Sequence, residues 1–188
     1  MRIIIVGAGA VGTHLAKLLS NEKQDITLID DSAEKLGKLE SNFDLLTFEG
    51  SPTSIRTLKD AGINGVDLFV AVTPEEGRNI TACIIAHSLG AKKTLARVDN
   101  YEYVQPKNRE FFKTLGIDSL IYPELLAAIE IADMAMEYDL QDETAMRLSV
   151  KSLLALGRRD DALVRYSVFQ ANYRRLSGEP YPVTFENR

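Results

Sequence analysis

The feature that most constrains this sequence is a short apolar run that leads directly into a glycine-rich loop. Residues 2–6, RIIIV, precede residues 7–12, GAGAVG, and apolar side chains at helical spacing follow. A continuous β-branched run predicts a strand that is buried on both faces, as in a parallel sheet. The chain therefore opens with a strand, a tight turn and a helix, and this order favours the α/β fold classes.

The alternation of strand-like and helix-like patterns continues to about residue 122. The predicted strands are residues 2–6, 25–30, 44–48, 66–72, 93–98 and 118–122, and the predicted helices are residues 11–20, 32–41, 52–61, 74–88 and 101–115. Ser51 and Thr73 each precede a proline, which predicts N-caps there, and Glu76 completes a predicted capping box with Thr73. Six short strands joined by helices predict a doubly wound, Rossmann-like parallel sheet.

The glycine loop has the spacing G-x-G-x-x-G at the junction of strand and helix, which is typical of dinucleotide binding. Gly7 permits the tight turn, Gly9 leaves the backbone open to a pyrophosphate, and Gly12 lets helix and strand pack closely. Asp30 ends the second strand, where a carboxylate accepts hydrogen bonds from ribose hydroxyls. The pattern predicts an adenine nucleotide such as NAD(H), ATP or ADP. The alternative is that the glycines serve turn geometry alone.

Other residues of the predicted crevice come from the carboxyl ends of the remaining strands. They are Asp31, Gly50, Ser51, Val72, Thr73, Asn79 and Arg97. Asp30 and Asp31 would together repel a ribose 2′-phosphate, which disfavours NADP, and the alternative for Asp31 is that it caps the second helix. Arg97 would face a phosphate, with an ion pair to Asp99 or Glu124 as the alternative.

Composition and missing motifs narrow the function. Hydrophobic residues make up 45% and charged residues 26% of the chain, as in ordinary soluble domains. Apolar runs of about five residues are too short to cross a bilayer, and no signal peptide is expected. The net charge of −5 argues against broad binding of nucleic acid. Cys83 is the single cysteine, which fits a reducing, cytoplasmic setting, and it is expected in the core.

The sequence contains no G-x-S-x-G, Walker lysine or H-E-x-x-H motif. His14 and His87 are expected at the surface or in packing. The chain is therefore predicted to hold a nucleotide without catalytic residues, and we do not expect an enzyme.

The chain changes character near residues 125–142. Nine of ten lysines precede Leu140, whereas seven of twelve arginines follow it. Two further helices are predicted, at residues 145–157 and 160–176. In their antiparallel hairpin, Leu148, Leu153 and Leu154 are expected to oppose Ala162, Tyr166 and Phe169. We therefore predict a nucleotide-binding domain at residues 1–130 and a small helical tail at residues 131–188.

Six local patterns in residues 1–130 resemble the nucleotide-binding domain, called RCK or KTN, of the Trk/Ktr potassium-transport regulators. They are the loop at residues 7–12, Asp30, residues 50–53, residues 70–73 with Asn79, residues 96–98, and Tyr122-Pro123-Glu124. The resemblance implies a regulatory, homo-oligomeric protein on the cytoplasmic side of the membrane. It would bind NAD(H), ATP or ADP and gate a potassium-transporting membrane subunit through a conformational change.

The resemblance also implies roles for individual residues. The phosphates would lie against Gly7, Ala8, Gly9, Ala10, Val11 and Gly12. Asp30 would hold the ribose, Gly50 and Ser51 would border the adenine, and Arg97 would neutralise phosphate charge. Glu124 would reach the partner subunit's nucleotide or a divalent cation bound with ATP.

The tail resembles other proteins. Residues 155–162 are similar to the turn of a tetratricopeptide repeat, and residues 129–185 to the helical repeats of bacterial transcriptional activators. One repeat cannot bury its own apolar faces, so the tail should pack on the first domain, a second copy or a partner. Two alternatives to the regulatory function therefore stay open: a fragment of an NAD-dependent oxidoreductase, and a transcription-linked scaffold led by the tail.

Overall fold

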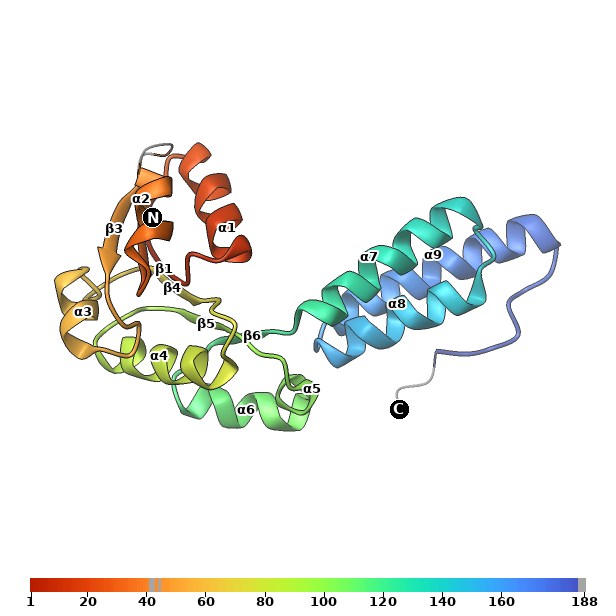
Figure 1. Ribbon diagram of the computed structural model, residues 1–188. Coiled ribbons are helices and arrows are strands. Elements are labelled where there is room, and N and C mark those ends of the chain that lie inside the picture. The colour runs from red at the N-terminus through yellow and green to blue at the C-terminus, as the bar shows by residue number, and fades with distance from the viewer. Residues whose placement is uncertain (41–42, 44, 186–188) are drawn as a thin grey trace. The chain divides into compact units, whose positions relative to one another are not determined.

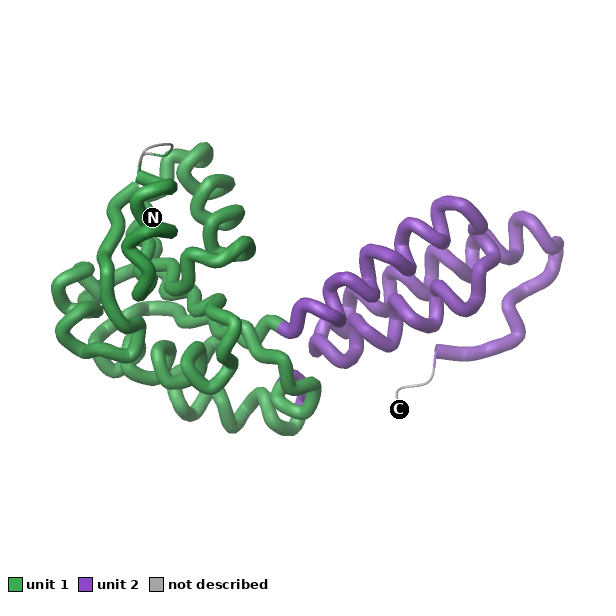
Figure 2. Tube along the Cα trace, viewed as in Figure 1, with its two compact units in different colours: residues 1–103, 107–121 green, residues 104–106, 122–188 purple. Residues whose placement is uncertain are grey.

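In a computed structural model, which describes residues 1–40, 43 and 45–185, the chain forms two compact units (Figure 2). The first unit comprises residues 1–103 and 107–121. The second comprises residues 104–106 and the chain from residue 122 onward. The two units divide between residues 121 and 122. Residue 130, the domain boundary predicted from the sequence, lies within the helix that follows this division.

The first unit is built on a six-stranded sheet, which confirms the Rossmann-like doubly wound fold (Figure 1). Its strands are β1 (Arg2–Val6), β2 (Asp25–Asp30), β3 (Leu46–Glu49), β4 (Leu68–Ala71), β5 (Thr94–Arg97) and β6 (Ser119–Ile121). Neighbouring strands pair in parallel in the order β3-β2-β1-β4-β5-β6. The strand order reverses between β1 and β4, and this switch point is where such folds bind ligands.

Helices lie on both faces of the sheet. They are α1 (Ala10–Asn21), α2 (Ala33–Glu40), α3 (Ile55–Asp60), α4 (Glu76–Ser88), α5 (Tyr101–Val104) and α6 (Pro106–Thr114). Ile3 and Ile5 of β1 belong to the core cluster that includes Ala16 of α1. Ile4 and Val6 alternate with them along the strand, so they point to the opposite face, and both are equally buried. The unbroken apolar run of β1 follows from this burial on both faces.

Two of the predicted helix starts are wrong. Helix α3 begins at Ile55, with Ser54 as its N-cap, whose side chain accepts the main-chain N–H of Thr57 at 3.3 Å. Ser51 therefore does not cap this helix. Helix α4 begins at Glu76, after the predicted cap Thr73. The Thr73 hydroxyl donates to the Asn79 side chain at 2.7 Å instead, so the proposed capping box does not form.

The single helix predicted over residues 101–115 is two helices, α5 and α6. Pro106 begins α6, and a proline disfavours helical geometry in the residue before it, which here is Gln105. The other elements agree with the predicted ranges to within about two residues at most ends. Residues 41 and 44, which the predictions included, lie outside the described residues.

The second unit contains α7 (Pro123–Tyr138), α8 (Glu143–Ala155) and α9 (Arg159–Ser177), and α8 packs against both α7 and α9. The predicted hairpin thus gains a third helix. Leu153 and Ala162 share one buried cluster, whereas Leu148, which was also expected to oppose the second helix of the hairpin, is 43% exposed. Among the described residues, no helix has the length and apolar character that a membrane span requires.

Candidate nucleotide-binding site

The predicted site lies at the carboxyl ends of β1, β2 and β4. The Gly7 N–H donates to the Ile29 carbonyl at 2.8 Å, and the Val72 N–H donates to the Val6 carbonyl at 2.9 Å. These bonds continue the sheet past the last assigned pairs and hold the three loops side by side. The glycine loop thus opens at the switch point of the sheet.

Two of the three motif glycines are required by close contacts. Gly7 has a φ of +102°, and a Cβ on it would lie 3.0 Å from the Thr73 nitrogen. A Cβ on Gly12 would lie 1.8 Å from the Gly7 carbonyl oxygen and 3.3 Å from Val72 Cγ2. The roles predicted for Gly7 in the turn and for Gly12 in helix–strand packing therefore follow directly from the backbone positions.

Gly9 differs from the other two glycines. Its φ is −78°, which any residue can adopt, and a Cβ on it would have no heavy atom within 4 Å. Gly9 is also the N-cap of α1 and supplies no side-chain hydrogen bond to the free N–H groups of that helix. The space above Gly9 is thus open beside an uncapped helix N-terminus, and this arrangement fits a diphosphate.

Asp30 is buried next to this loop. Its Oδ2 accepts the Ala8 N–H at 2.6 Å, its Oδ1 accepts the Ser32 N–H at 2.9 Å, and Lys35 Nζ lies 3.6 Å away. The residue is 7% exposed. The carboxylate predicted to hold a ribose therefore also holds the glycine loop in place, and its role toward the ribose stays a prediction.

Asn79 connects the loops on the other side of the crevice. Its Nδ2 donates to the carbonyl oxygens of Thr73 and Arg97, both at 2.9 Å. Its Oδ1 accepts the N–H of Thr73 at 2.9 Å in addition to the hydroxyl. These four bonds use the full capacity of the amide, and Asn79 is 1% exposed. Asn79 and Thr73 therefore set the spacing between the ends of β4 and β5.

Two guanidinium groups belong to this part of the fold. Arg97 Nη2 lies 3.0 Å from Asp99 Oδ1, which is one of the ion pairs foreseen as alternatives to a phosphate contact. Its Nε is buried and lacks a hydrogen-bond partner among the described residues. Arg78 Nη2 lies 2.7 Å from Asp31 Oδ2. This hydrogen bond lowers the pKa of the Asp31 carboxyl below its usual value.

Sequence reasoning did not find Arg78, because it lies inside a helix and belongs to no motif. The sequence predicts that Asp31 either faces the nucleotide or caps the second helix. It lies two residues before Ala33, where α2 begins, and its carboxylate pairs with Arg78 rather than with that helix. One feature of the sequence could have pointed to Arg78: it is an arginine in the first turn of the helix that follows the fourth strand.

The remaining predicted residues divide between the two units. Gly50 has a φ of +157°, and a Cβ there would lie 2.7 Å from Thr57 Oγ1. Ser51 Oγ accepts the Thr53 N–H at 3.3 Å within the same loop. Glu124 lies in the first turn of α7, in the second unit, so its predicted role stays a prediction.

Over residues 1–40, 43 and 45–185, no cluster of three or more His, Cys, Asp or Glu side chains could hold a metal ion.

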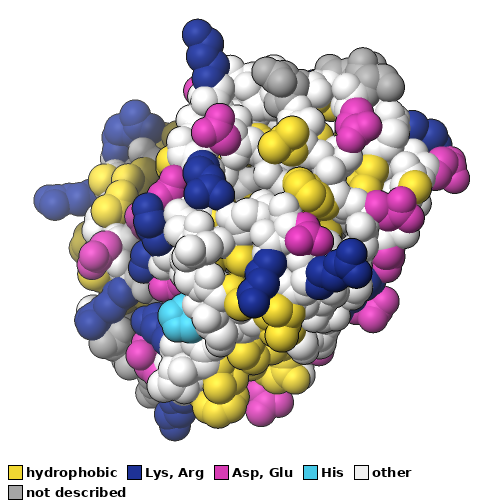
Figure 3. All heavy atoms as spheres, turned by 90° about the vertical axis from the view of Figure 1, so that its left-hand side faces the viewer, with side chains coloured by type: hydrophobic (Ala, Val, Ile, Leu, Met, Phe, Trp, Pro, Cys, Tyr) yellow, Lys and Arg dark blue, Asp and Glu magenta, His cyan; other side chains and the backbone are white. Residues whose placement is uncertain are grey.

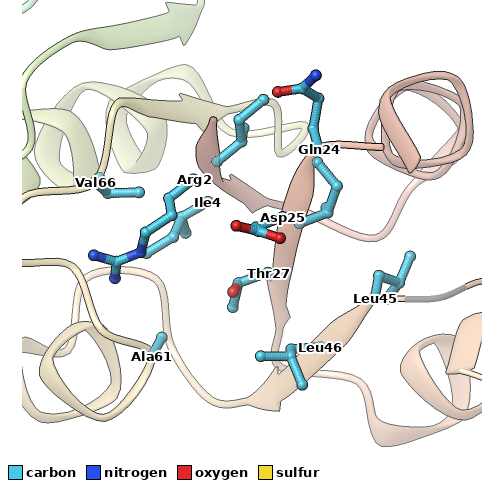
Figure 4. Close-up of a pocket in the computed structure, with 11 residues that line it drawn as sticks. Arg2, Ile4, Gln24, Asp25, Thr27, Leu45, Leu46, Ala61 and Val66 are labelled. Carbon is cyan, nitrogen blue, oxygen red and sulfur yellow. The ribbon is translucent and has the colours of Figure 1, made fainter. Parts of the chain in front are cut away.

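A hollow of about 400 Å³ lies at the opposite edge of the sheet (Figure 4). It is lined at the amino ends of β1, β2 and β3 by residues that include Arg2, Asp25, Thr27 and Leu46. Because ligands of doubly wound sheets bind at the carboxyl ends of the strands, this hollow is separate from the candidate site.

Figure 3 shows one face of the protein, where acidic and basic side chains are interspersed with hydrophobic ones.

Comparison with known families identifies the same region. The TrkA-N domain matches residues 3–123. The Trk system potassium uptake protein TrkA of Haemophilus influenzae is 44% identical over 133 residues, which are 70% of this chain and 29% of that protein. A TrkA homolog of Methanothermobacter thermautotrophicus is 38% identical over 128 residues, 68% of this chain and 57% of that protein. The chain thus spans less than two thirds of either relative.

Solved structures share the fold at low sequence identity. The NAD(P)-binding domain of an exopolyphosphatase-related protein from Archaeoglobus fulgidus has a TM-score of 0.62 and 19% identity, and the match covers 72% of this chain and 98% of that domain. The GsuK channel bound to NAD has a TM-score of 0.57 and 18% identity over 70% of this chain and 23% of that chain. The AMP-bound Kef C-terminal domain of Shewanella denitrificans has a TM-score of 0.60 and 18% identity over 89% of this chain and 97% of that chain.

Proposed function

The chain belongs to the TrkA-N domain family, and we propose that it is a regulatory nucleotide-binding module of a Trk- or Ktr-type potassium uptake system. In this proposal a nucleotide binds at the carboxyl edge of the sheet and shifts the equilibrium between two conformations of the module. That shift gates a potassium-transporting membrane subunit. The module acts on the cytoplasmic side of the membrane, as part of a homo-oligomer.

One observation carries the nucleotide proposal: the open space above Gly9 at the uncapped N-terminus of α1. A diphosphate there would accept hydrogen bonds from main-chain N–H groups and would face the positive end of the helix dipole. Asp30 ends the neighbouring strand β2, and in this proposal its carboxylate accepts hydrogen bonds from the ribose hydroxyls. NAD(H), ATP and ADP all combine a diphosphate with a ribose that keeps both hydroxyls.

We further propose that the module binds its nucleotide without converting it. A dehydrogenase places a proton donor or acceptor beside the nicotinamide, usually on a second domain. The crevice residues found here hold backbone loops together and do not form an acid–base pair. Incubation with NADH and a panel of small carbonyl compounds should leave the nicotinamide absorbance constant. A substrate-dependent fall in absorbance would favour the oxidoreductase alternative instead.

Thermal unfolding of the full chain with millimolar ADP, ATP, NADH or NADPH tests the proposal. A ligand at 100 times its dissociation constant adds about 2.7 kcal/mol to the free energy of unfolding. We expect a raised melting temperature with at least one of ADP, ATP and NADH. NADPH should raise it less, because Asp30 and Asp31 lie where a 2′-phosphate would approach. An unchanged melting temperature with all four ligands would contradict the proposal.

A further inference from the structure

The ion pair between Arg78 and Asp31 spans the end of the strand that carries the glycine loop. The two residues are 47 positions apart in the sequence. Asp31 directly follows β2, and Arg78 lies in the first turn of α4, the helix after β4. Because β1 lies between β2 and β4, the contact reaches across the carboxyl end of β1, where Gly7 begins the loop.

The backbone that carries Arg78 is held firmly. Glu76 Oε2 accepts two main-chain N–H groups of the loop after β5, each at 2.9 Å. Asn79 joins the same turn of α4 to the ends of β4 and β5. The guanidinium group is therefore the part of Arg78 that can move. Its partner Asp31 has a side chain that is 55% exposed, so this carboxylate can be solvated once it is released.

The chemistry of the contact is the chemistry of phosphate binding. A guanidinium presents the same paired donors to a carboxylate and to a phosphate. A phosphate at the N-terminus of α1 would bring a second anion close to Asp31, and the two would repel each other. If Arg78 turns from the carboxylate to the phosphate and Asp31 moves into water, this repulsion is relieved, the phosphate gains a cationic partner and the carboxylate is hydrated.

We propose that Arg78 is a phosphate-binding residue of the nucleotide site and that Asp31 is its internal competitor in the unliganded chain. This inference rests on the proposed nucleotide binding and adds a ligand preference to it. Nucleoside diphosphates and triphosphates carry more charge than monophosphates and compete better with the carboxylate for Arg78. The module therefore favours ADP over AMP.

Equilibrium binding of ADP and AMP to variants of the full chain tests the inference. Asp31→Asn weakens the competitor, and Arg78→Gln removes the guanidinium but keeps a polar side chain. The double variant combines the two changes. Asp25→Asn is the matched control, because it changes the net charge equally at the opposite edge of the sheet.

We expect Asp31→Asn to tighten ADP binding about two- to fivefold, the range expected for release of an exposed ion pair. Asp25→Asn should leave ADP binding unchanged. Arg78→Gln should weaken ADP binding about tenfold or more, and AMP binding less, because a charge-assisted hydrogen bond to phosphate is lost. In the double variant the gain from Asp31→Asn should be smaller than with Arg78 present, because only the relief of charge repulsion is left once there is no guanidinium to compete for.

Two results would overturn the inference while leaving the proposed function intact. The first is wild-type ADP binding that Arg78→Gln does not weaken. The second is a gain from Asp31→Asn that is equally large with and without Arg78, because general relief of negative charge then explains it. If the wild-type chain binds no nucleotide, the proposed function itself fails and the inference fails with it. Circular dichroism of each variant separates a loss of binding from a loss of folding.

Discussion

Asp30 Oδ2 accepts a hydrogen bond of 2.6 Å from the main-chain N–H of Ala8, and both residues are buried. The end of β2 is thereby tied to the second residue of the glycine loop. The bond fixes the peptide that joins Gly7 to Ala8, and the next residue is Gly9, above which the structure is open. The carboxylate that the sequence assigns to a ribose thus also shapes the cradle for the phosphates.

Replacing Asp30 should therefore cost stability even without a nucleotide. Asp30→Ala leaves the N–H groups of Ala8 and Ser32 without their acceptor, and we expect a loss of about 1.5–3 kcal/mol in the free energy of unfolding. Urea denaturation measures this loss. Asp25→Ala, at the exposed start of the same strand, should change stability by less than about 0.5 kcal/mol. Equal losses in the two variants would contradict the structural role of Asp30.

The glycines of the loop should respond differently to alanine. Gly12→Ala places a Cβ 1.8 Å from a backbone oxygen, so we expect a loss of about 3 kcal/mol or failure to fold. Gly9→Ala meets open space at an ordinary φ and should cost about 1 kcal/mol or less. Chemical denaturation of both variants tests this order. A Gly9→Ala variant as unstable as Gly12→Ala would show that the space above Gly9 is filled.

Asn79 should be a stability residue of the crevice. Asn79→Ala removes four hydrogen bonds at a site that is 1% exposed, and we expect a loss of about 2–4 kcal/mol. Thr81→Ala is the control on the same helix, because Thr81 is exposed and its hydroxyl bonds only within α4. Its effect should stay within about 0.5 kcal/mol. Comparable unfolding midpoints for the two variants would contradict the role of Asn79 in joining the ends of β4 and β5.

Cys83 should be inert in the folded chain. Burial raises the pKa of its thiol to about 12, and the side chain is fully buried in α4. Since the thiolate is the reactive form, a thiol reagent at pH 8 should modify Cys83 only after denaturation. With a reagent that releases a coloured thiolate when it reacts with a cysteine, the absorbance in native buffer and in urea measures how much Cys83 is modified in each. Rapid modification of the native chain would contradict the packing of α4 against the sheet.

The same thiol should make stability depend on alkaline pH. The unfolded chain loses this proton near its ordinary pKa of 9.0, whereas the folded chain keeps it to about 12. The folded state therefore binds more protons between these values, and its stability falls as pH rises, by about 1.4 kcal/mol per pH unit from this group. Cys83→Ala should remove that contribution. An unchanged slope in the variant would contradict the raised pKa.

The sheet could be predicted from the sequence because each of its strands carries a local signal. The β1 run and the G-x-G-x-x-G spacing fix the first strand, turn and helix, and the contacts of Gly7 and Gly12 depend on the backbone alone. The third helix of the second unit was not foreseen. From the sequence, residues 125–142 are placed at the junction of the two predicted domains and no helix is predicted over residues 123–138, although Pro123 is an ordinary first residue of a helix.

The side-chain contacts of the candidate site could not be predicted in the same way. Thr73 precedes a proline, which resembles a helix cap, but its hydroxyl bonds to Asn79, which a buried amide requires. The pairing of Arg78 with Asp31 depends on the order β2-β1-β4, which brings together residues from two separate loops. Such contacts arise from tertiary packing, and no local pattern encodes them.

The central claim is that a nucleotide diphosphate binds against the main chain at Gly9, and isothermal titration with ADP tests it most directly. The wild-type chain should bind ADP saturably. Gly9→Ala should remain folded but bind ADP much more weakly, because its Cβ occupies the space that the diphosphate needs. A wild-type chain that binds none of ADP, ATP and NADH, or a folded Gly9→Ala variant that binds the nucleotide equally well, would contradict the account.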